Sequence, residues 1–230
     1  MKSFKILLAA SVLALSTSTA FAQGVGTWSD PSQQQSGGVG SQILNNQINL
    51  QTNWSNLTGS VDTVGGDVVV QGNAGGNLVD VTTMNDTRVN NTQYVGPNAT
   101  IGSNVAVDVS NVAGSVGITN QAICNGANVS TDPILTAVKS NQACHATDPY
   151  SEINTNISNI GGNAVVQGMA VGNKLETDSN APNFPIMSRQ LNNSGVVSNV
   201  NANVFNAAGT VGLSSSAVGN TAQVLHYSTN

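Results

Sequence analysis

Charged and aromatic side chains are scarce in this chain of 230 residues, of which 7% are charged and 4% are aromatic. With only six Lys and Arg residues, the chain lacks the basic clusters that follow a phosphate backbone, so nucleic acid is not an expected partner. Glu, Lys, Leu and Arg, which dominate coiled coils and helical repeats, are also scarce. Disorder is disfavoured because 39% of the residues are hydrophobic. The chain is instead rich in Asn, Val and Gly, which indicates a β-rich protein.

Long apolar runs are missing except at the N-terminus, which excludes a bundle of membrane-spanning helices. Residues 1–22 read as a secretory signal peptide: Lys2 and Lys5 supply positive charge, residues 6–15 are apolar, and residues 20–22 form a small-x-small cleavage site. Ten apolar residues are too short for an anchoring helix. Cleavage removes two of six basic residues and leaves 4 basic against 11 acidic groups, a net charge of −7. We expect a secreted protein on the outer cell surface, or in the periplasm in transit.

Two cysteines remain after cleavage, Cys124 and Cys144. In an oxidising compartment an even number of cysteines predicts a disulfide. The alternative, a redox or metal pair assisted by His145, matches no zinc-binding spacing.

The chain contains an internal duplication. Residues 64–77 (VGGDVVVQGNAGGN) and 160–173 (IGGNAVVQGMAVGN) are identical at nine of fourteen positions, at an offset of 96 residues. Residues 105–118 and 200–213 resemble each other at an offset of 95. Two blocks in the same order and at nearly equal spacing indicate a repeat rather than chance low complexity.

The duplication suggests a division of the chain after the signal peptide. It comprises a Gln/Ser/Gly-rich leader (23–60), a first β-repeat copy (61–130), an inserted loop carrying one disulfide partner (131–158) and a second copy (159–230). Equivalent positions should share one environment. We expect the pairs Val69/Val165 and Val107/Ala202 to face inward, and Gly114/Gly209 to mark matching turns.

Short strands are indicated throughout the two copies. Val105, Val107 and Val109 alternate with small or polar residues, and Gly-Asn, Gly-Gly and Asn-Gly pairs separate the apolar segments. Small apolar residues, corner glycines and abundant Asn favour stacked β-coils. The predicted fold is all-β, built from duplicated β-solenoid or β-roll-like units, with a β-sandwich as the alternative.

Catalytic constellations are weak. The only histidines are His145 and His226, and the acidic residues form no motif for hydrolysis or metal binding. Asp62 and Asp67 flank a Gly-Gly turn, but two carboxylates without a loop signature are usually solvated turn residues. The sequence therefore predicts no enzyme, no catalytic residue, no metal and no cofactor. Trp54, if exposed, would suit stacking on sugar rings, which leaves a secreted carbohydrate-binding or carbohydrate-active β-helix as the alternative function.

A resemblance is carried by three segments: residues 217–224 (AVGNTAQV), 69–74 (VVQGNA) and 165–170 (VVQGMA). The chain resembles bacterial curlin-type subunits and the related holdfast-attachment surface proteins, although curlin repeats are about twenty residues long. The resemblance implies an exported protein that anchors or builds an adhesive or fibrous surface structure. It also implies passage through an outer-membrane export pore, and partners among surface fibre or anchor subunits, including the chain itself, and exopolysaccharide.

An assembly edge is predicted near the C-terminus. This segment has low charge, high β-propensity and no Pro, and neither Lys nor Pro follows Arg189. Such a strand is suited to pair with another chain. The predicted assembly edge consists of Ala217, Val218, Gly219, Asn220, Thr221, Ala222, Gln223 and Val224.

Overall fold

The computed structural model describes residues 41–84, 87–131, 136–180 and 184–227. The predicted signal peptide and the leader up to residue 40 lie outside the described residues. None of the described residues belongs to a helix long and apolar enough to cross a membrane.

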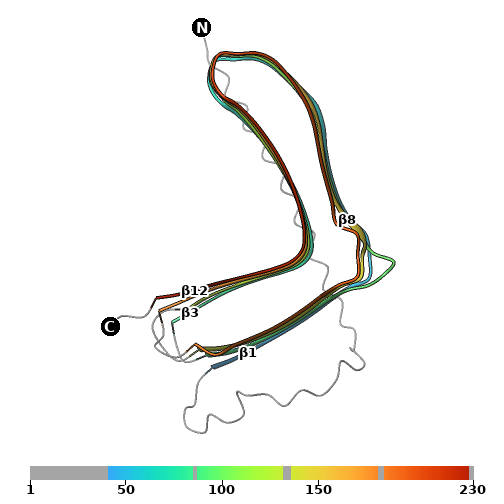
Figure 1. The fold of residues 1–230 in the computed structure, drawn as a ribbon, viewed down its shortest axis with the longest axis vertical. Coiled ribbons are helices and arrows are strands. Elements are labelled where there is room, and N and C mark those ends of the chain that lie inside the picture. Colours follow the sequence, from blue (N-terminus) through green and yellow to red (C-terminus); the bar gives the residue numbers. More distant parts are fainter. Residues whose placement is uncertain (1–40, 85–86, 132–135, 181–183, 228–230) are drawn as a thin grey trace.

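The described chain winds through four successive coils, each made of three strands (Figure 1). Coil 1 contains β1 (Ser41–Asn49), β2 (Asn53–Val64) and β3 (Val68–Thr83). Coil 2 contains β4 (Thr87–Val95), β5 (Thr100–Val112) and β6 (Val116–Thr131). Coil 3 contains β7 (Thr136–Cys144), β8 (Thr147–Ile160) and β9 (Ala164–Ser179). Coil 4 contains β10 (Ile186–Asn192), β11 (Val197–Ala207) and β12 (Val211–His226).

Every strand pairs in parallel with its counterpart in the next coil, which gives three four-stranded sheets. We call β1-β4-β7-β10 the foot sheet, β2-β5-β8-β11 the leg sheet and β3-β6-β9-β12 the bent sheet. Viewed along the stacking direction, the coils superimpose in a bent outline in which the bent sheet faces the leg sheet and then turns to face the foot sheet (Figure 1). Parallel stacking confirms the predicted β-solenoid and differs from the antiparallel layers of a β-sandwich.

The core is a stack of small apolar side chains in three clusters. The largest lies between the leg sheet and the first half of the bent sheet and includes Val105, Ile118 and Ile153, all fully buried. A second cluster lies at the bend and contains both cysteines. The third lies between the foot sheet and the second half of the bent sheet, around Val129 and Val138. The alternation predicted for Val105, Val107 and Val109 is confirmed, since all three are buried.

One corner recurs in every coil with a left-handed backbone. The residues with positive φ include Thr63, Asn111, Asn159 and Asn206, at 58°, 54°, 56° and 57°. Asn adopts this conformation more readily than most non-glycine residues. Asn159 donates to Asn111, and Asn206 donates to Asn159, so the corner amides also join successive coils.

The structural repeat is one coil of about 48 residues, as the pairing of Asn77 with Asn125 and of Asn125 with Asn173 shows. The sequence offset of 96 therefore spans two coils. The odd coils resemble each other around Gly65-Gly66 and Gly161-Gly162, and the even coils resemble each other around their Ala-Gly turns. The chain is thus an alternation of two kinds of coil.

The interpretation of residues 131–158 as an inserted loop is wrong, because this segment contains β7 and most of β8. Both strands are paired on each side and help to form coil 3. Likewise, residues 41–60 of the predicted leader form β1 and much of β2 in coil 1. One inward column holds Asn49, Val95, Cys144 and Asn192 in successive coils, so strands that stack on one another differ in sequence.

The environments predicted for equivalent positions of the two copies are only partly confirmed. Val69 and Val165 face outward, with 75% and 37% of their surface exposed, while their neighbours Val70 and Val166 face the core. A run of Val residues carries no alternation, and the inward phase is instead set by Gly72, whose missing Cβ leaves room for Asn120. Val107 is buried, as predicted.

The other two expectations agree with the structure. Ala202 packs against the large cluster. Gly114 and Gly209 occupy matching turns, and in each a Cβ atom would meet the backbone of a glycine one coil earlier, Gly66 or Gly162.

Candidate functional site

The predicted assembly edge lies in β12, the last strand of the bent sheet. On one side it pairs with β9, with Ala217 opposite Ala170 and Val224 opposite Thr177. No described strand pairs with its other side. The structure therefore brings all eight predicted residues together on one outer strand.

Charge is distributed unevenly between this outer strand and the one beneath it. In β9, Lys174 and Glu176 form an ion pair at 2.9 Å. The residues of β12 opposite them are Thr221 and Gln223, which carry no charge. Lysine on an edge strand normally discourages pairing with another chain. Here the charges lie on the strand already enclosed in the sheet, and the outer strand has none.

Core-facing side chains are exposed at the outer face of coil 4. Leu213 is 53% exposed, whereas its counterpart in coil 3, Val166, is fully buried. Val224 is 50% exposed, and its counterpart Thr177 is 2% exposed. The apolar interior thus continues to the end of the stack, where no described residue covers it.

Two columns of amide side chains run through the interior. In the bent sheet, Asn77 donates to Asn125, Asn125 to Asn173 and Asn173 to Asn220, with N–O distances of 2.7–2.9 Å. The first three are buried, and Asn220 is exposed at the end. The assembly edge therefore holds the last member of a continuous hydrogen-bonded column.

The second column lies in the foot sheet and runs through Gln47, Gln93, Gln142 and Gln190. Each later glutamine donates from Nε2 to Oε1 of the one before it, at 2.8–2.9 Å. Each also donates to a backbone carbonyl of the facing bent sheet, those of Leu78, Gly126, Lys174 and Thr221. This column joins successive coils and also connects the foot sheet to the bent sheet.

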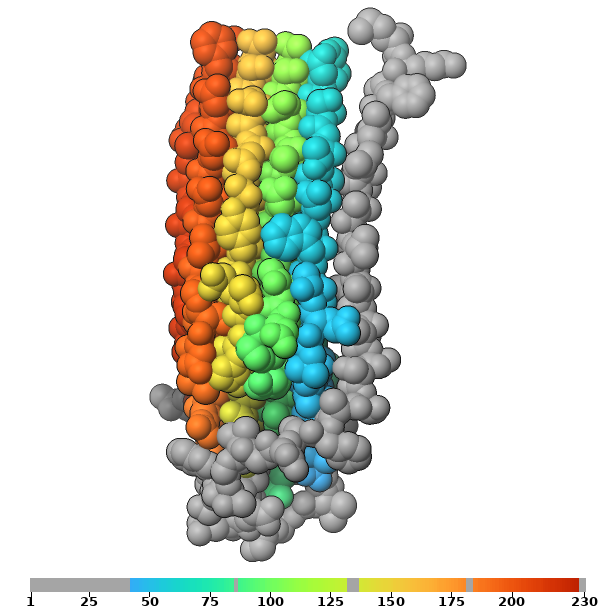
Figure 2. Space-filling model, turned by 90° about the vertical axis from the view of Figure 1, so that its right-hand side faces the viewer, coloured from blue at the N-terminus to red at the C-terminus, as the bar shows by residue number. Residues whose placement is uncertain are grey.

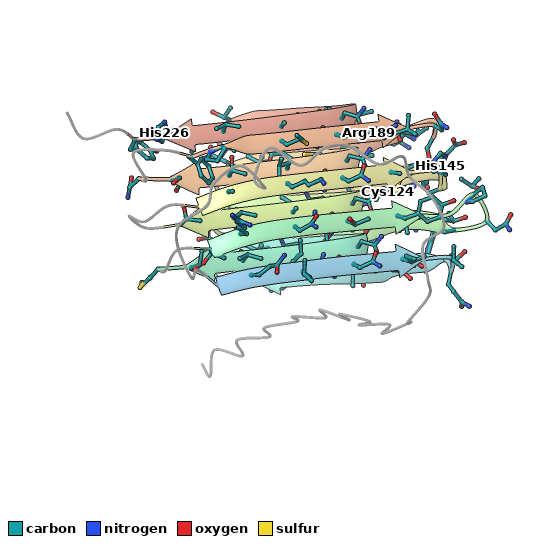
Figure 3. All side chains as sticks on the ribbon, turned by 90° about the horizontal axis from the view of Figure 1, so that it is seen from below. Cys124, His145, Arg189 and His226 are labelled. Atoms are coloured by element: carbon teal, nitrogen blue, oxygen red, sulfur yellow. A yellow bond between two sulfur atoms is a disulfide. The ribbon has the colours of Figure 1, made fainter. Side chains whose placement is uncertain are left out.

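The groups considered for catalysis serve other contacts. His145 lies against Tyr94, with ring centroids 5.5 Å apart, and His226 lies against Phe184 at 6.4 Å. Figure 3 shows His145 and His226 at opposite ends of the foot sheet. No three His, Cys, Asp or Glu residues in the described part of the chain are placed to hold a metal ion.

Asp62 and Asp67 act as turn residues. Asp62 accepts hydrogen bonds from Ser110 and Asn111 at 2.7 Å, and these bonds hold its pKa below the ordinary value. Asp67 accepts from the backbone N–H of Ser115 at 2.7 Å. Both carboxylates therefore connect coil 1 to coil 2.

The predicted disulfide between Cys124 and Cys144 is present, with a Cα–Cα distance of 6.0 Å. Cys124, labelled in Figure 3, belongs to coil 2 and Cys144 to coil 3, and both are fully buried in the second core cluster. The bond therefore crosses the core between successive coils, and it does not fasten an inserted loop. Closing a loop of this size stabilises a protein by about 3 kcal/mol in the chain-entropy model.

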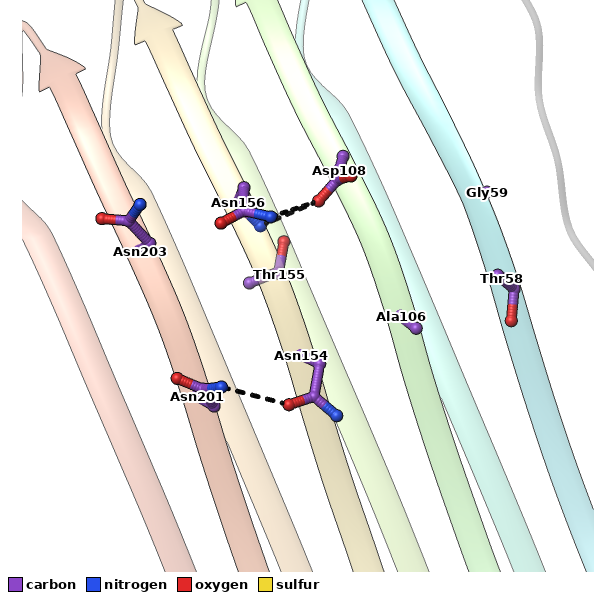
Figure 4. Close-up of a pocket in the computed structure, with 9 residues that line it drawn as sticks. All are labelled: Thr58, Gly59, Ala106, Asp108, Asn154, Thr155, Asn156, Asn201 and Asn203. Carbon is purple, nitrogen blue, oxygen red and sulfur yellow. Dashed lines mark hydrogen bonds between the residues drawn. The ribbon is translucent and has the colours of Figure 1, made fainter.

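The outer face of the leg sheet carries a shallow groove and an aromatic pair. Figure 2 shows this face, with the four coils side by side. The groove has a volume of about 380 Å³ and is lined mainly by small and amide side chains, with Asp108 as its charged residue (Figure 4).

On the same sheet, Trp54 stacks on Tyr150, with ring centroids 6.4 Å apart. The indole ring lies above Gly102, where a Cβ atom would meet it. Burial and the neighbouring Glu152 raise the pKa of Tyr150.

The family model of HfaD, holdfast attachment protein D, matches residues 10–227 of the chain. The chain belongs to this family. The comparisons with curated proteins and with solved structures gave no match.

Membership of the HfaD family confirms the resemblance to holdfast-attachment proteins seen in the sequence. It places the chain among attachment proteins of adhesive surface structures, and thus at the cell surface or outside the cell. The same membership points to association with other holdfast or surface components.

Sequence reasoning located the predicted edge on a strand that is an outer one and predicted the disulfide, but it missed both amide columns. Their members are separated by 46–49 residues, as in the pairs Gln47/Gln93 and Gln93/Gln142. A search for Asn and Gln recurring at about 48 residues would have found them. The 96-residue similarity drew attention to every second coil and concealed this shorter period.

Proposed function

We propose that this HfaD-family chain is an exported, non-enzymatic structural protein that anchors or builds the adhesive structure at the cell surface. Export is supported by the signal-peptide pattern of residues 1–22. A structural role is supported by the composition, in which catalytic residue types are scarce, and by the family match. The route we propose is the outer-membrane export pore implied by the resemblance to curlin-type subunits.

The observation that carries the proposal is the open outer side of β12. An uncharged strand with half-exposed apolar neighbours is suited to recruit a further strand through backbone hydrogen bonds. An anchor needs such a surface, because it must hold other subunits of the adhesive structure. We therefore propose residues 217–224 as the edge that binds other fibre or anchor subunits.

The test is a pair of lysine substitutions on this edge, Val218→Lys with Val224→Lys, compared with the pair Val165→Lys with Gln167→Lys. The control residues face outward from β9, the neighbour of β12 in the same sheet, and do not line the leg-sheet groove. Cells producing the edge variant should export it and fail to retain it at the surface, while the control variant is retained. Circular dichroism of the purified proteins checks that both are folded. An edge variant that is folded, exported and retained at the wild-type level contradicts the assignment.

A second candidate function, carbohydrate binding, is favoured by the Trp54–Tyr150 pair beside the amide-lined groove. Flat aromatic surfaces and amide groups are suited to sugar rings, and exopolysaccharide is the proposed ligand. Affinity electrophoresis in gels containing the cell's exopolysaccharide should show retardation of the wild type and loss of it in Trp54→Ala. Phe205→Ala is the control, since Phe205 is 70% exposed on the same sheet. Equal mobility of the Trp54→Ala variant and the wild type would argue against this candidate.

A further inference from the structure

We propose that the partner of the open end is a second copy of this chain, stacked head to tail so that coil 1 of one copy continues coil 4 of another. The proposal rests on the proposed assembly function and names the partner and the register of the contact. Continued parallel stacking would produce a filament with a rise of roughly 19 Å per copy, four strand spacings of about 4.8 Å each.

The first observation is the alternation of two kinds of coil. The contact between coil 2 and coil 3 joins an even coil to an odd one, with Asn120 donating to the carbonyl of Glu152 and Ser151 donating to the carbonyl of Asn120. The described chain ends with an even coil and begins with an odd one. Placing coil 4 before coil 1 of another copy therefore again follows an even coil with an odd one. Ser55 of coil 1 holds the place of Ser151, whereas coil 4 has Ser215 at the place of Asn120, so the order of the coils is repeated but the donation from Asn120 is not.

The second observation is a glycine of coil 1 beside an open space that is filled at the equivalent place in coil 3. A Cβ atom on Gly161 would lie 2.3 Å from the carbonyl oxygen of Ala113 in the preceding coil. Its counterpart in coil 1, Gly65, has nothing within 4 Å of that position and no positive φ that would require glycine. The carbonyl of Ala208, the coil 4 counterpart of Ala113, would occupy this space in a head-to-tail contact.

The opposite end leaves space for a further coil without requiring glycine. A Cβ atom on Gly172 would lie 2.3 Å from the carbonyl oxygen of Gly219 in the following coil. Gly219 itself meets only the side chain of Asn192, at 3.2 Å. Its counterpart in the other even coil is Cys124, which carries a side chain although coil 3 follows it, so Gly65 is the glycine that supports the head-to-tail contact.

The third observation is the direction of the amide columns. Within the described residues, no hydrogen bond reaches Oε1 of Gln190, while Nε2 of Gln47 uses one of its two hydrogens, on the carbonyl of Leu78. Among the same described residues, Asn220 donates no hydrogen bond from Nδ2, and Asn77 accepts none at Oδ1. Stacking coil 1 on coil 4 brings each donor to its acceptor: Gln47 to Gln190, and Asn220 to Asn77.

A buried amide adds an independent indication. Asn49 is 4% exposed, and its Nδ2 has no hydrogen-bond partner. It begins a column that continues through Val95 and Cys144 and ends at Asn192. In the stacked arrangement Asn192 of the preceding copy lies directly against Asn49, which supplies a partner for a group that is costly to leave unpaired.

The register of the contact is fixed by these columns. Gln47 and Gln190, Asn77 and Asn220, and Ser60 and Asn203 occupy equivalent places in coil 1 and coil 4. Ser60 and Asn203 both face outward. Within one chain they are three coils apart, roughly 14 Å, which is too far for a disulfide. Across a head-to-tail contact they are neighbours.

The decisive experiment is cysteine cross-linking of the purified full exported chain. Under mild oxidation, the double variant Ser60→Cys with Asn203→Cys should give a ladder of covalent oligomers on a non-reducing gel. The displaced pair Ser60→Cys with Asn201→Cys should give at least ten times less. Equal, weak cross-linking by both pairs overturns the proposed register.

The variant Gly65→Ala should weaken the contact between copies and leave the fold of the single chain unchanged. The added methyl group has open space in the described chain but meets the Ala208 carbonyl in the stacked arrangement. Gly212→Ala is the control, because its position is equally open in coil 4 and its counterparts Val69 and Val165 already carry larger side chains. Sedimentation velocity should show oligomers for wild type and control, and about tenfold weaker association for Gly65→Ala with unchanged circular dichroism.

The outcomes separate this inference from the proposed function. A wild-type chain that stays monomeric at every concentration tested overturns head-to-tail stacking. If the lysine variant of residues 218 and 224 still loses surface retention in that case, the edge binds a different protein and the anchoring function stands. If Gly65→Ala assembles as well as the wild type, the Ala208 contact, and with it the proposed stacking, is wrong.

Discussion

The buried glutamine column gives the most exacting prediction about what holds the coils together. Gln142 is fully buried and takes part in three hydrogen bonds: it donates to Gln93 and to the carbonyl of Lys174, and it accepts from Gln190. The substitution Gln142→Leu keeps a side chain of similar size and removes all three. Each buried hydrogen bond contributes about 1 kcal/mol net to the free energy of unfolding, and the partner groups left unpaired add to this loss. The burial of the apolar leucine side chain offsets part of it. We expect the free energy of unfolding to fall by about 2–4 kcal/mol.

The assay is equilibrium unfolding in urea followed by circular dichroism, with the slope of the transition compared between variants. Gln167→Leu is the matched control, because Gln167 is exposed on the outer face of β9 and substitutions at such positions change stability by about 0.5 kcal/mol or less. Equal stability of the Gln142→Leu and Gln167→Leu variants would refute the view that the amide column stabilises the stack.

Three further predictions concern the disulfide, the strand phase and acid. Replacing both Cys124 and Cys144 by Ala should lower the unfolding free energy by about 3 kcal/mol, and reductant should shift the unfolding midpoint of the wild type but not that of the variant. Val166→Asp, which places a charge in the core, should prevent folding as judged by circular dichroism, whereas Val165→Asp should fold; the reverse result would contradict the phase of β9. Because the pKa of Asp62 is lowered in the folded state, its contribution to stability is complete above its ordinary pKa of about 4 and is lost as the pH falls through the lower folded value. Thermal melting of Asp62→Asn should therefore be less sensitive to acid than that of the wild type in this range, and identical acid profiles would show that these hydrogen bonds do not matter.

The class of fold could be predicted because its causes are local. Alternating Val residues such as Val105 and Val107, with glycine-rich turns between short segments, indicate strands that stack around a narrow core. The outer strand could also be located, since low charge and the lack of Pro or Lys after Arg189 are properties of the sequence alone.

The number and boundaries of the coils could not be obtained in the same way. Inward positions of one column change from Asn49 to Val95 to Cys144 to Asn192, so that neighbouring coils have little sequence similarity. The backbone hydrogen bonds of parallel strands, which define the coil, leave no trace in side-chain identity. The amide columns depend on contacts between residues about 48 positions apart, and only the stacking of the coils brings these residues together.

The measurement that tests the central claim most directly is the retention of the adhesive at the cell surface in cells with and without this HfaD-family chain. Cells lacking the gene should still produce the adhesive material but release it into the medium, and the chain of complemented cells should fractionate with the outer surface. Surface attachment and adhesive retention should return with the wild-type gene. Cells that lack the gene and retain the adhesive at the wild-type level would contradict the account.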